Sequence, residues 1–164
     1  MKVYDCFMYF DEDLVLELRL NLLDKYVDYF VIVESKYNHK GESKKLNFNI
    51  EKFKKFEKKI IYLVFDQEPS DLYKFEKKDT QADISSKYIF NAGKRENGQR
   101  NFISRGLKDS KSDDIIIISD VDEIPNLAGI NFNTIKNEII IFRHEMFYYK
   151  FNLKLPNYKW TGSK

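Results

Sequence analysis

Short apolar runs recur along the chain and alternate with segments in which leucine or phenylalanine repeats at helical spacing. Three of these runs, at residues 3–10, 29–33 and 60–65, predict strands because they are short and rich in β-branched and aromatic residues. A fourth run consists of the four consecutive isoleucines of residues 115–118. Since no polar residue interrupts it, we expect this strand to be buried on both faces, at the centre of a parallel sheet.

The segments between these runs predict helices. Three acidic residues precede leucines spaced four apart, which predicts a helix that ends near Tyr26. Residues 50–58 predict a second helix, with its lysines on the solvated face. A third helix is predicted at residues 96–108, whereas residues 66–94 show only a weak helical tendency at 82–90.

The order of these elements predicts an α/β fold. Alternation of strands and helices implies a mostly parallel sheet with helices on both faces. Two later apolar runs, residues 138–142 and 145–151, predict a hairpin that adds an antiparallel edge. No repeat and no low-complexity linker divides the sequence, so we expect residues 1–164 to form one domain.

Composition narrows the class of protein. The chain has 28 basic and 26 acidic residues, a balance that argues against a nucleic-acid-binding surface. Its one cysteine, Cys6, excludes an internal disulfide and a cysteine-based metal site, and its apolar surroundings predict burial. Because the apolar runs are far shorter than a membrane span and the N-terminus lacks a signal-peptide pattern, we expect a soluble, cytoplasmic protein.

Three carboxylates follow the isoleucine run within four residues. They are Asp120, Asp122 and Glu123, and Pro125 then prevents a helix from continuing. Carboxylates crowded at the carboxyl end of a buried strand repel one another and are costly to desolvate. A bound Mg²⁺ or Mn²⁺ is the simplest compensation, and ligands of open α/β sheets bind at this end of the strands. We therefore predict a metal site that holds a phosphorylated ligand; the alternative is a solvated acidic turn.

Other polar residues are predicted near the same edge of the sheet. Arg95, Gln99 and Arg100 stand at the start of the helix predicted before the isoleucine strand. Helix N-termini and guanidinium groups both favour phosphate oxygens, although ordinary surface charges would give the same pattern. Glu34 follows the second strand and either accepts hydrogen bonds from a ribose or base, or caps the neighbouring loop.

Several common active-site patterns are missing from the sequence. It has only two histidines, which argues against a histidine-based catalytic or metal cluster. It also lacks the glycine-rich loops of dinucleotide-binding and P-loop enzymes and the Gly-x-Ser-x-Gly elbow of hydrolases. These absences leave the acidic residues after the isoleucine run as the strongest candidate site.

A set of motifs, in order along nearly the whole chain, resembles glycosyltransferase family 17. This is the family of β-1,4-mannosyl-glycoprotein β-1,4-N-acetylglucosaminyltransferase. The motifs are Tyr4-Asp5-Cys6-Phe7-Met8-Tyr9-Phe10, Glu17-x-Arg19-Leu20-Asn21, Val27-Asp28-Tyr29-Phe30-Val31-Ile32-Val33-Glu34-Ser35, His39-x-Gly41, Arg95-Glu96-x-x-Gln99-Arg100-Asn101 and Ser119-Asp120-Val121-Asp122-Glu123-Ile124-Pro125, with weaker matches at Phe147-Tyr148-Tyr149 and Trp160-x-Gly162.

This resemblance implies a GT-A-like (Rossmann-like) fold and a metal-dependent, inverting glycosyltransferase. Such an enzyme moves a sugar from a UDP-sugar, UDP-N-acetylglucosamine in the characterised relatives, to a hydroxyl of a glycan or another acceptor. Asp120 and Asp122 then form the Asp-x-Asp pair, with Asp122 the preferred ligand of Mn²⁺ or Mg²⁺ and Asp120 shared between metal and ribose. Arg95 and Arg100 would bind the diphosphate. Glu123 is a candidate general base.

Two other functions remain open. Family members usually extend beyond the tryptophan–glycine region, whereas this chain ends at Lys164, so we expect a donor-binding portion that lacks part of the acceptor pocket. Such a portion could bind nucleotide sugars without turnover. A haloacid-dehalogenase-type phosphatase also places Asp-x-Asp after an apolar strand, with Asp120 as nucleophile. That family, however, normally has this strand first and needs later lysine and acidic motifs.

Overall fold

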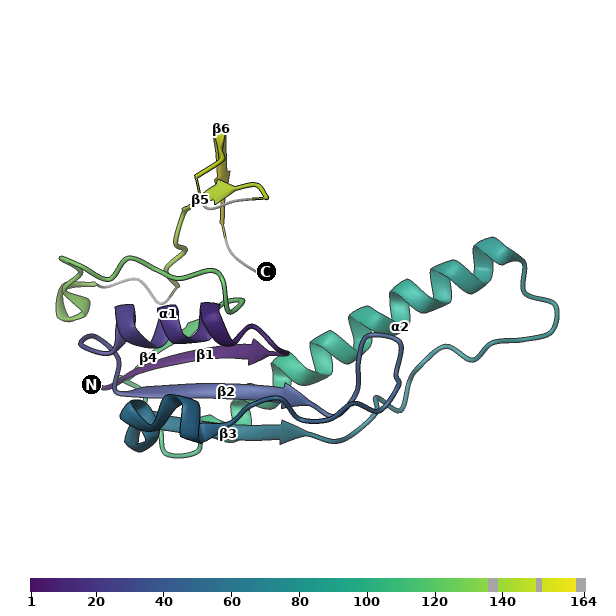
Figure 1. The fold of residues 1–164 in the computed structure, drawn as a ribbon, viewed down its shortest axis with the longest axis horizontal. Coiled ribbons are helices and arrows are strands. Elements are labelled where there is room, and N and C mark those ends of the chain that lie inside the picture. The colour runs from purple at the N-terminus through teal and green to yellow at the C-terminus, as the bar shows by residue number, and fades with distance from the viewer. Residues whose placement is uncertain (136–138, 150–151, 162–164) are drawn as a thin grey trace.

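A four-stranded parallel sheet forms the body of the protein. The computed structural model describes residues 1–135, 139–149 and 152–161. The strand order is β3-β2-β1-β4 (Figure 1). The strands are β1 (Val3–Tyr9), β2 (Tyr29–Ser35), β3 (Ile60–Phe65) and β4 (Ile115–Ile118). The predicted α/β fold with a parallel sheet is confirmed.

Helices cover both faces of this sheet. Helix α1 (Asp13–Leu23) and the 3₁₀ segment η1 (Ile50–Lys59) pack on one face, and the 3₁₀ segment η2 (Phe102–Leu107) packs on the other. Alternate residues of β1 therefore enter different cores: Phe7 faces α1, whereas Cys6 lies on the η2 side. Cys6 is fully buried, as expected, and burial raises the pKa of its thiol.

Helix α1 carries two rows of leucine, and only one row is buried. The buried row is Leu16, Leu20 and Leu23, and the exposed row is Leu14, Leu18 and Leu22. Arg19 lies beside the buried leucines and is itself 0% exposed. The helix thus turns one charged side chain into the protein while it leaves three leucines in solvent. Because a buried charge is costly unless it is paired, Arg19 requires a partner beneath the helix.

The isoleucine strand lies at an edge of the sheet, and the prediction that it is central was wrong. Among the described strands, β4 pairs only with β1. Ile117 is 6% exposed, but Ile116 and Ile118 are 36% and 49% exposed. An unbroken apolar run reflects β propensity, whereas the position of a strand in the sheet depends on the connections of the chain.

The helix before β4 is longer than predicted. Helix α2 runs from Gln81 to Asn101 as one element, so the weak tendency at 82–90 and the start of the predicted 96–108 helix belong together. Thr80 caps its N-terminus, because the Thr80 hydroxyl accepts from the Asp83 amide and the Asp83 carboxylate accepts from the Thr80 amide. The first half of α2 projects past the sheet (Figure 1), so it needs no apolar stripe.

A separate two-stranded antiparallel sheet follows. It pairs β5 (His144–Phe147) with β6 (Lys154–Trp160), which confirms a late hairpin but corrects its strands and its place, because it does not extend the main sheet. Of the predicted strand 138–142, residue 138 lies outside the described residues and the remainder is not a strand. The predicted strand 145–151 overlaps β5, and residues 150–151 also lie outside the described part.

Strand β6 was not predicted, because its sequence is too polar to form an apolar run. Two of its lysines pair with Glu145 on β5: Lys154 Nζ lies 2.7 Å and Lys159 Nζ 2.8 Å from Glu145 Oε1. These ion pairs link the two strands of the hairpin, which also has a β-bulge between Glu145 and Phe147. Among the helices of the described residues, none combines the length and apolarity that a membrane span requires. The single-domain organisation stays a prediction.

Candidate functional site

The three predicted carboxylates lie in a tight turn directly after β4. We call residues 119–125 the acidic loop. The Glu123 amide donates to the Asp120 carbonyl oxygen at 3.0 Å, and the Ile124 amide donates to that of Asp122 at 3.1 Å. Glu123 closes the turn from its side chain, since its Oε2 accepts from the Asp120 amide at 3.0 Å. Glu123 is buried, Asp120 is half-buried and Asp122 is exposed, so the turn presents Asp122 to solvent.

A fully buried ion pair lies beneath this loop. Arg19 Nε and Nη2 donate to the two oxygens of Asp5 at 2.8 Å and 2.7 Å, and both residues are 0% exposed. Asp5 belongs to β1 and points to the face that α1 covers, which brings it to Arg19. The guanidinium carbon also lies 4.5 Å from the centre of the Phe7 ring.

The same guanidinium holds the backbone of the acidic loop. Arg19 Nη1 donates to the carbonyl oxygens of Asp120 at 2.7 Å, Val121 at 3.1 Å and Glu123 at 3.3 Å, and Nη2 donates to Ser119 Oγ at 2.7 Å. Sequence reasoning missed this role. The available signal was an arginine in the middle of a leucine helix, within one of the motifs that carry the family resemblance.

Arg100 is the predicted phosphate ligand that the structure brings to the acidic loop. Its Nη2 lies 3.0 Å from Asp120 Oδ1 and 3.1 Å from Glu96 Oε1, and it comes from the last turn of α2. One oxygen of Asp120 is therefore paired with a cation, and the guanidinium lies beside the exposed carboxylate end of the loop.

Arg95 and Gln99 have their partners elsewhere. Arg95 pairs with both oxygens of Glu68, at 2.8 Å and 3.0 Å, and donates to the His39 carbonyl oxygen at 3.2 Å. Gln99 Nε2 donates to the Val33 carbonyl oxygen at 2.8 Å, which ties α2 to β2. The prediction that these residues stand at the start of a helix was wrong, because α2 begins at Gln81. They lie instead towards its C-terminus, where the helix dipole disfavours anions.

Glu34 caps the loop that follows β2. Its Oε1 accepts from Lys44 Nζ at 2.5 Å and from the Asn47 amide at 2.7 Å, and its Oε2 accepts from the Phe48 amide at 3.1 Å and the Tyr62 hydroxyl at 2.8 Å. Burial, followed by this bond to Glu34, raises the pKa of Tyr62. Both carboxylate oxygens are engaged, which favours the loop-capping alternative over contact with a ribose or base.

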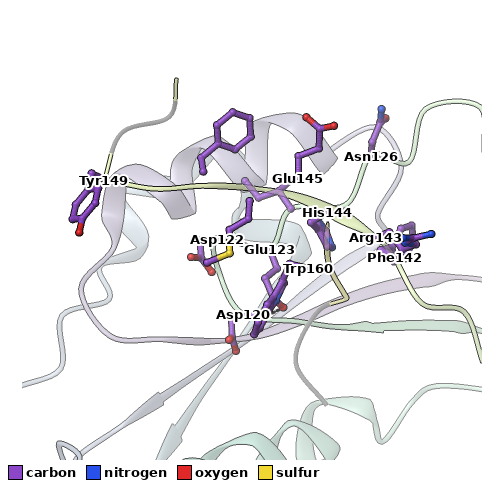
Figure 2. A pocket seen from close by; sticks show the side chains of 13 residues that line it. Asp120, Asp122, Glu123, Asn126, Phe142, Arg143, His144, Glu145, Tyr149 and Trp160 are labelled. Carbon is purple, nitrogen blue, oxygen red and sulfur yellow. Dashed lines mark hydrogen bonds between the residues drawn. The ribbon is translucent and has the colours of Figure 1, made fainter. Parts of the chain in front are cut away.

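A cavity of about 920 Å³ separates the acidic loop from the β5–β6 hairpin. Asp120, Asp122 and Glu123 line one side. The other side is largely aromatic and includes Phe142, His144, Met146, Phe147, Tyr149 and Trp160. Figure 2 shows Glu123, His144 and Trp160 close together, and the Trp160 indole N–H donates to Glu123 Oε1. The two walls of the cavity therefore meet at Glu123.

The Asp122 carboxyl is affected both by partial burial and by the two other carboxylates of the acidic loop. Partial desolvation, and then the charges of Asp120 and Glu123, raise the pKa of the Asp122 carboxyl. Within the described ranges, no three His, Cys, Asp or Glu side chains are grouped so as to hold a metal by themselves. Two aspartates fit Mg²⁺ or Mn²⁺ when phosphate oxygens complete the coordination, as is usual for nucleotide-bound cations.

The family follows from a comparison that covers the entire length. A search of curated proteins and a search of solved structures both gave no match. The family model described as "Glycosyltransferase family 17", however, matches residues 1–164. The parallel sheet with flanking helices agrees with the GT-A-like α/β fold that this family implies. The chain belongs to glycosyltransferase family 17 and is a glycosyltransferase.

Proposed function

We propose that this chain is a metal-dependent, inverting glycosyltransferase that moves N-acetylglucosamine from UDP-N-acetylglucosamine to a hydroxyl of a glycan or another acceptor. One observation carries this proposal: Asp120 and Asp122 line a large cavity at the carboxyl end of β4, in a chain of family 17. That end of a parallel strand is where ligands of open α/β sheets bind.

The two aspartates have different surroundings, which supports different tasks. Asp120 Oδ1 is paired with Arg100, whereas Asp122 is exposed to the cavity. We assign Asp122 as the direct ligand of Mn²⁺ or Mg²⁺, and Asp120 as a residue shared between the cation and the ribose. The bound cation would neutralise charge on the departing diphosphate. Arg100 would add a charge-assisted hydrogen bond to the same diphosphate.

Arg95, Gln99 and Glu34 are left out of this proposed donor site. Their hydrogen bonds join loops and helices of the fold, so their contact with a nucleotide sugar has no support from the geometry. Glu123 as general base stays a prediction. Its two oxygens accept from the Asp120 amide and the Trp160 indole, which favours a structural task.

The opposite wall of the cavity suits the acceptor. It offers aromatic faces together with the polar side chains of Arg143 and His144, the mixture of surfaces that typical ligand pockets present. A sugar hydroxyl bound here would face the anomeric carbon of a donor held at Asp122. The hairpin would then orient the acceptor, while the acidic loop holds the donor.

Thermal unfolding with nucleotide sugars tests the proposal. UDP-N-acetylglucosamine with Mn²⁺ should raise the Tm, by the equivalent of about 2.7 kcal/mol at a hundredfold excess over Kd. Asp122→Ala should remove this shift, whereas Asp109→Ala, which changes an exposed aspartate outside the acidic loop, should retain it. Lack of stabilisation by any nucleotide sugar contradicts the proposal. Stabilisation without transfer or donor hydrolysis would instead identify a binding module.

A further inference from the structure

The Arg19–Asp5 pair is unusual because its hydrogen bonds extend beyond the pair itself. All three guanidinium nitrogens are used: Nε and Nη2 bind Asp5, Nη2 also binds Ser119 Oγ, and Nη1 faces three carbonyl oxygens. A buried ion pair is seldom more stable than apolar side chains of similar volume. Stability of the core therefore gives no sufficient reason for a charge at this position.

The partners of Arg19 Nη1 indicate what the charge does. The carbonyl oxygens of Asp120, Val121 and Glu123 converge on one nitrogen, and carbonyl dipoles that converge in this way repel one another unless a cation lies between them. Ser119 adds a further link, since its hydroxyl donates to the Glu123 carbonyl oxygen at 3.1 Å and accepts from Arg19. The guanidinium thus fixes the path of the acidic loop on both sides of Asp122.

We propose that Arg19 is a positioning residue, which together with Asp5 holds the acidic loop in the one conformation that places Asp120 and Asp122 for metal and sugar-donor binding. This inference rests on the proposed function. Arg19 is fully buried and all three of its guanidinium nitrogens donate to protein oxygens, so it acts through the loop rather than on the substrate. Displacements of about 1 Å in such supporting groups are enough to weaken a site.

The geometry requires arginine rather than lysine. One edge of the planar guanidinium pairs with both Asp5 oxygens while Nη1 reaches the loop carbonyls. A lysine ammonium is a single point charge and cannot span both sets of partners. Arg19→Lys therefore keeps the buried positive charge that Asp5 needs but releases the loop. The variant thus tests whether Arg19 positions the loop or only neutralises Asp5.

Two measurements on the full chain test this inference. In the ligand-free protein, hydrogen exchange of the amides of residues 120–124 should become about tenfold faster in Arg19→Lys. With UDP present, Mn²⁺ affinity should fall about tenfold, as is common when a group that supports a metal ligand is changed. Excess Mn²⁺ should restore donor binding and transfer. A purely structural loss would not respond to Mn²⁺ in this way.

Val27→Ala provides the matched control. Val27 is 3% exposed and precedes β2, at the opposite end of the strands from the acidic loop, so this variant loses stability without touching the loop. Its loop exchange and Mn²⁺ affinity should equal those of the wild type. If Arg19→Lys behaves like Val27→Ala, or if the loop loosens while Mn²⁺ affinity stays unchanged, the inference is overturned.

Ser119→Ala covers the case in which Arg19→Lys does not fold. It removes one hydroxyl from the network and leaves the ion pair. Amide exchange in residues 120–124 should therefore become about threefold faster, and Mn²⁺ affinity should fall about threefold. Wild-type loop exchange and Mn²⁺ affinity in Ser119→Ala would overturn the inference. Failure of the proposed function looks different, because the wild type itself would then bind no nucleotide sugar. Exchange in the ligand-free acidic loop would still decide whether Arg19 positions it.

Discussion

The two walls of the cavity are held in place by different kinds of interaction. The acidic loop stands on a fully buried ion pair, and its backbone carbonyls are fixed from below by Arg19. The hairpin wall is held by ion pairs of Glu145 with exposed lysines, and by the contact of Trp160 with Glu123. Exposed ion pairs contribute only about 0–1 kcal/mol each. One wall is therefore preorganised, whereas the other adjusts easily.

This difference suits the proposed reaction. The nucleotide-sugar donor and its cation require fixed carboxylates, because electrostatic stabilisation of a leaving group depends on groups that are already in place. An acceptor wall tolerates adjustment, since it must admit the acceptor and release a larger product. Perturbing each wall separately should therefore give effects of different kind and size.

The largest effect should come from the acidic loop, which is the wall of the cavity that we propose binds the donor. Asp122→Asn keeps the shape of the side chain but removes the charge that would bind the cation, so kcat/KM for transfer should fall at least ~100-fold. The loss should appear at every acceptor concentration. Steady-state kinetics with varied Mn²⁺ measure it. A variant that retains wild-type activity at low Mn²⁺ would show that Asp122 is not the ligand.

A smaller effect is expected from the hairpin wall. Trp160→Phe keeps an aromatic ring but removes the N–H that binds Glu123, at a cost of about 1.5 kcal/mol for a bond to a charged group. The KM for acceptor should rise about tenfold, while donor affinity by calorimetry stays unchanged. Tyr158→Phe on the same strand serves as the control and should change neither quantity. Equal losses of donor and acceptor binding would erase the distinction between the walls.

The ionised carboxylate of Asp122 in the acidic loop should also lower the stability of the folded protein. The folded state raises the pKa of Asp122, so the protonated form favours folding and this contribution is lost as pH rises through that pKa. At pH 7 without metal, Asp122→Asn should therefore raise the Tm, but only by roughly 1 °C because the side chain is exposed to solvent. Near pH 3 the difference should vanish. Calorimetry in EDTA at both pH values checks this, and a lower Tm at pH 7 would contradict it.

The smallest effect should come from the ion pairs of the hairpin. Hydrogen bonds from Lys154 and Lys159 lower the pKa of Glu145 to about 2. A depressed carboxyl pKa contributes stability above pH 4.5, which is lost as the pH falls towards 2. Because the group is exposed, Glu145→Gln should lower the Tm at pH 7 by roughly 1 °C or less. High salt should remove the difference. A larger loss would mean that the hairpin is held as firmly as the acidic loop.

The sequence could predict the sheet and the acidic loop because both depend on neighbouring residues. The strands appeared as contiguous apolar runs, and the Asp-x-Asp pair lies in one short segment with the proline that ends it. The edge position of β4 could not be predicted in this way, because a strand's neighbours are chosen by connections that the local pattern does not contain.

The supporting network was missed for a related reason. Hydrophobic patterning assumes that charged side chains lie outside, so Arg19 was assigned to no core and Asp5 was only part of an apolar strand. Their pairing joins residues 14 positions apart and reaches the loop about 100 positions later. Arg95 and Gln99 were misplaced because the helix start was set by apolar periodicity, whereas the cap at Thr80 begins it earlier.

The edge position of β4 has a consequence for the behaviour of the protein in solution. Among the described strands, β4 pairs on one side only, and residues 139–142 lie near its carboxyl end without forming a strand. An apolar strand edge of this kind is a template on which a second chain can add. The net charge of only +2 provides little repulsion between molecules near neutral pH. Concentrated solutions should therefore aggregate most readily near the isoelectric point of about 8.4, and mildly acidic buffers should keep the protein dispersed.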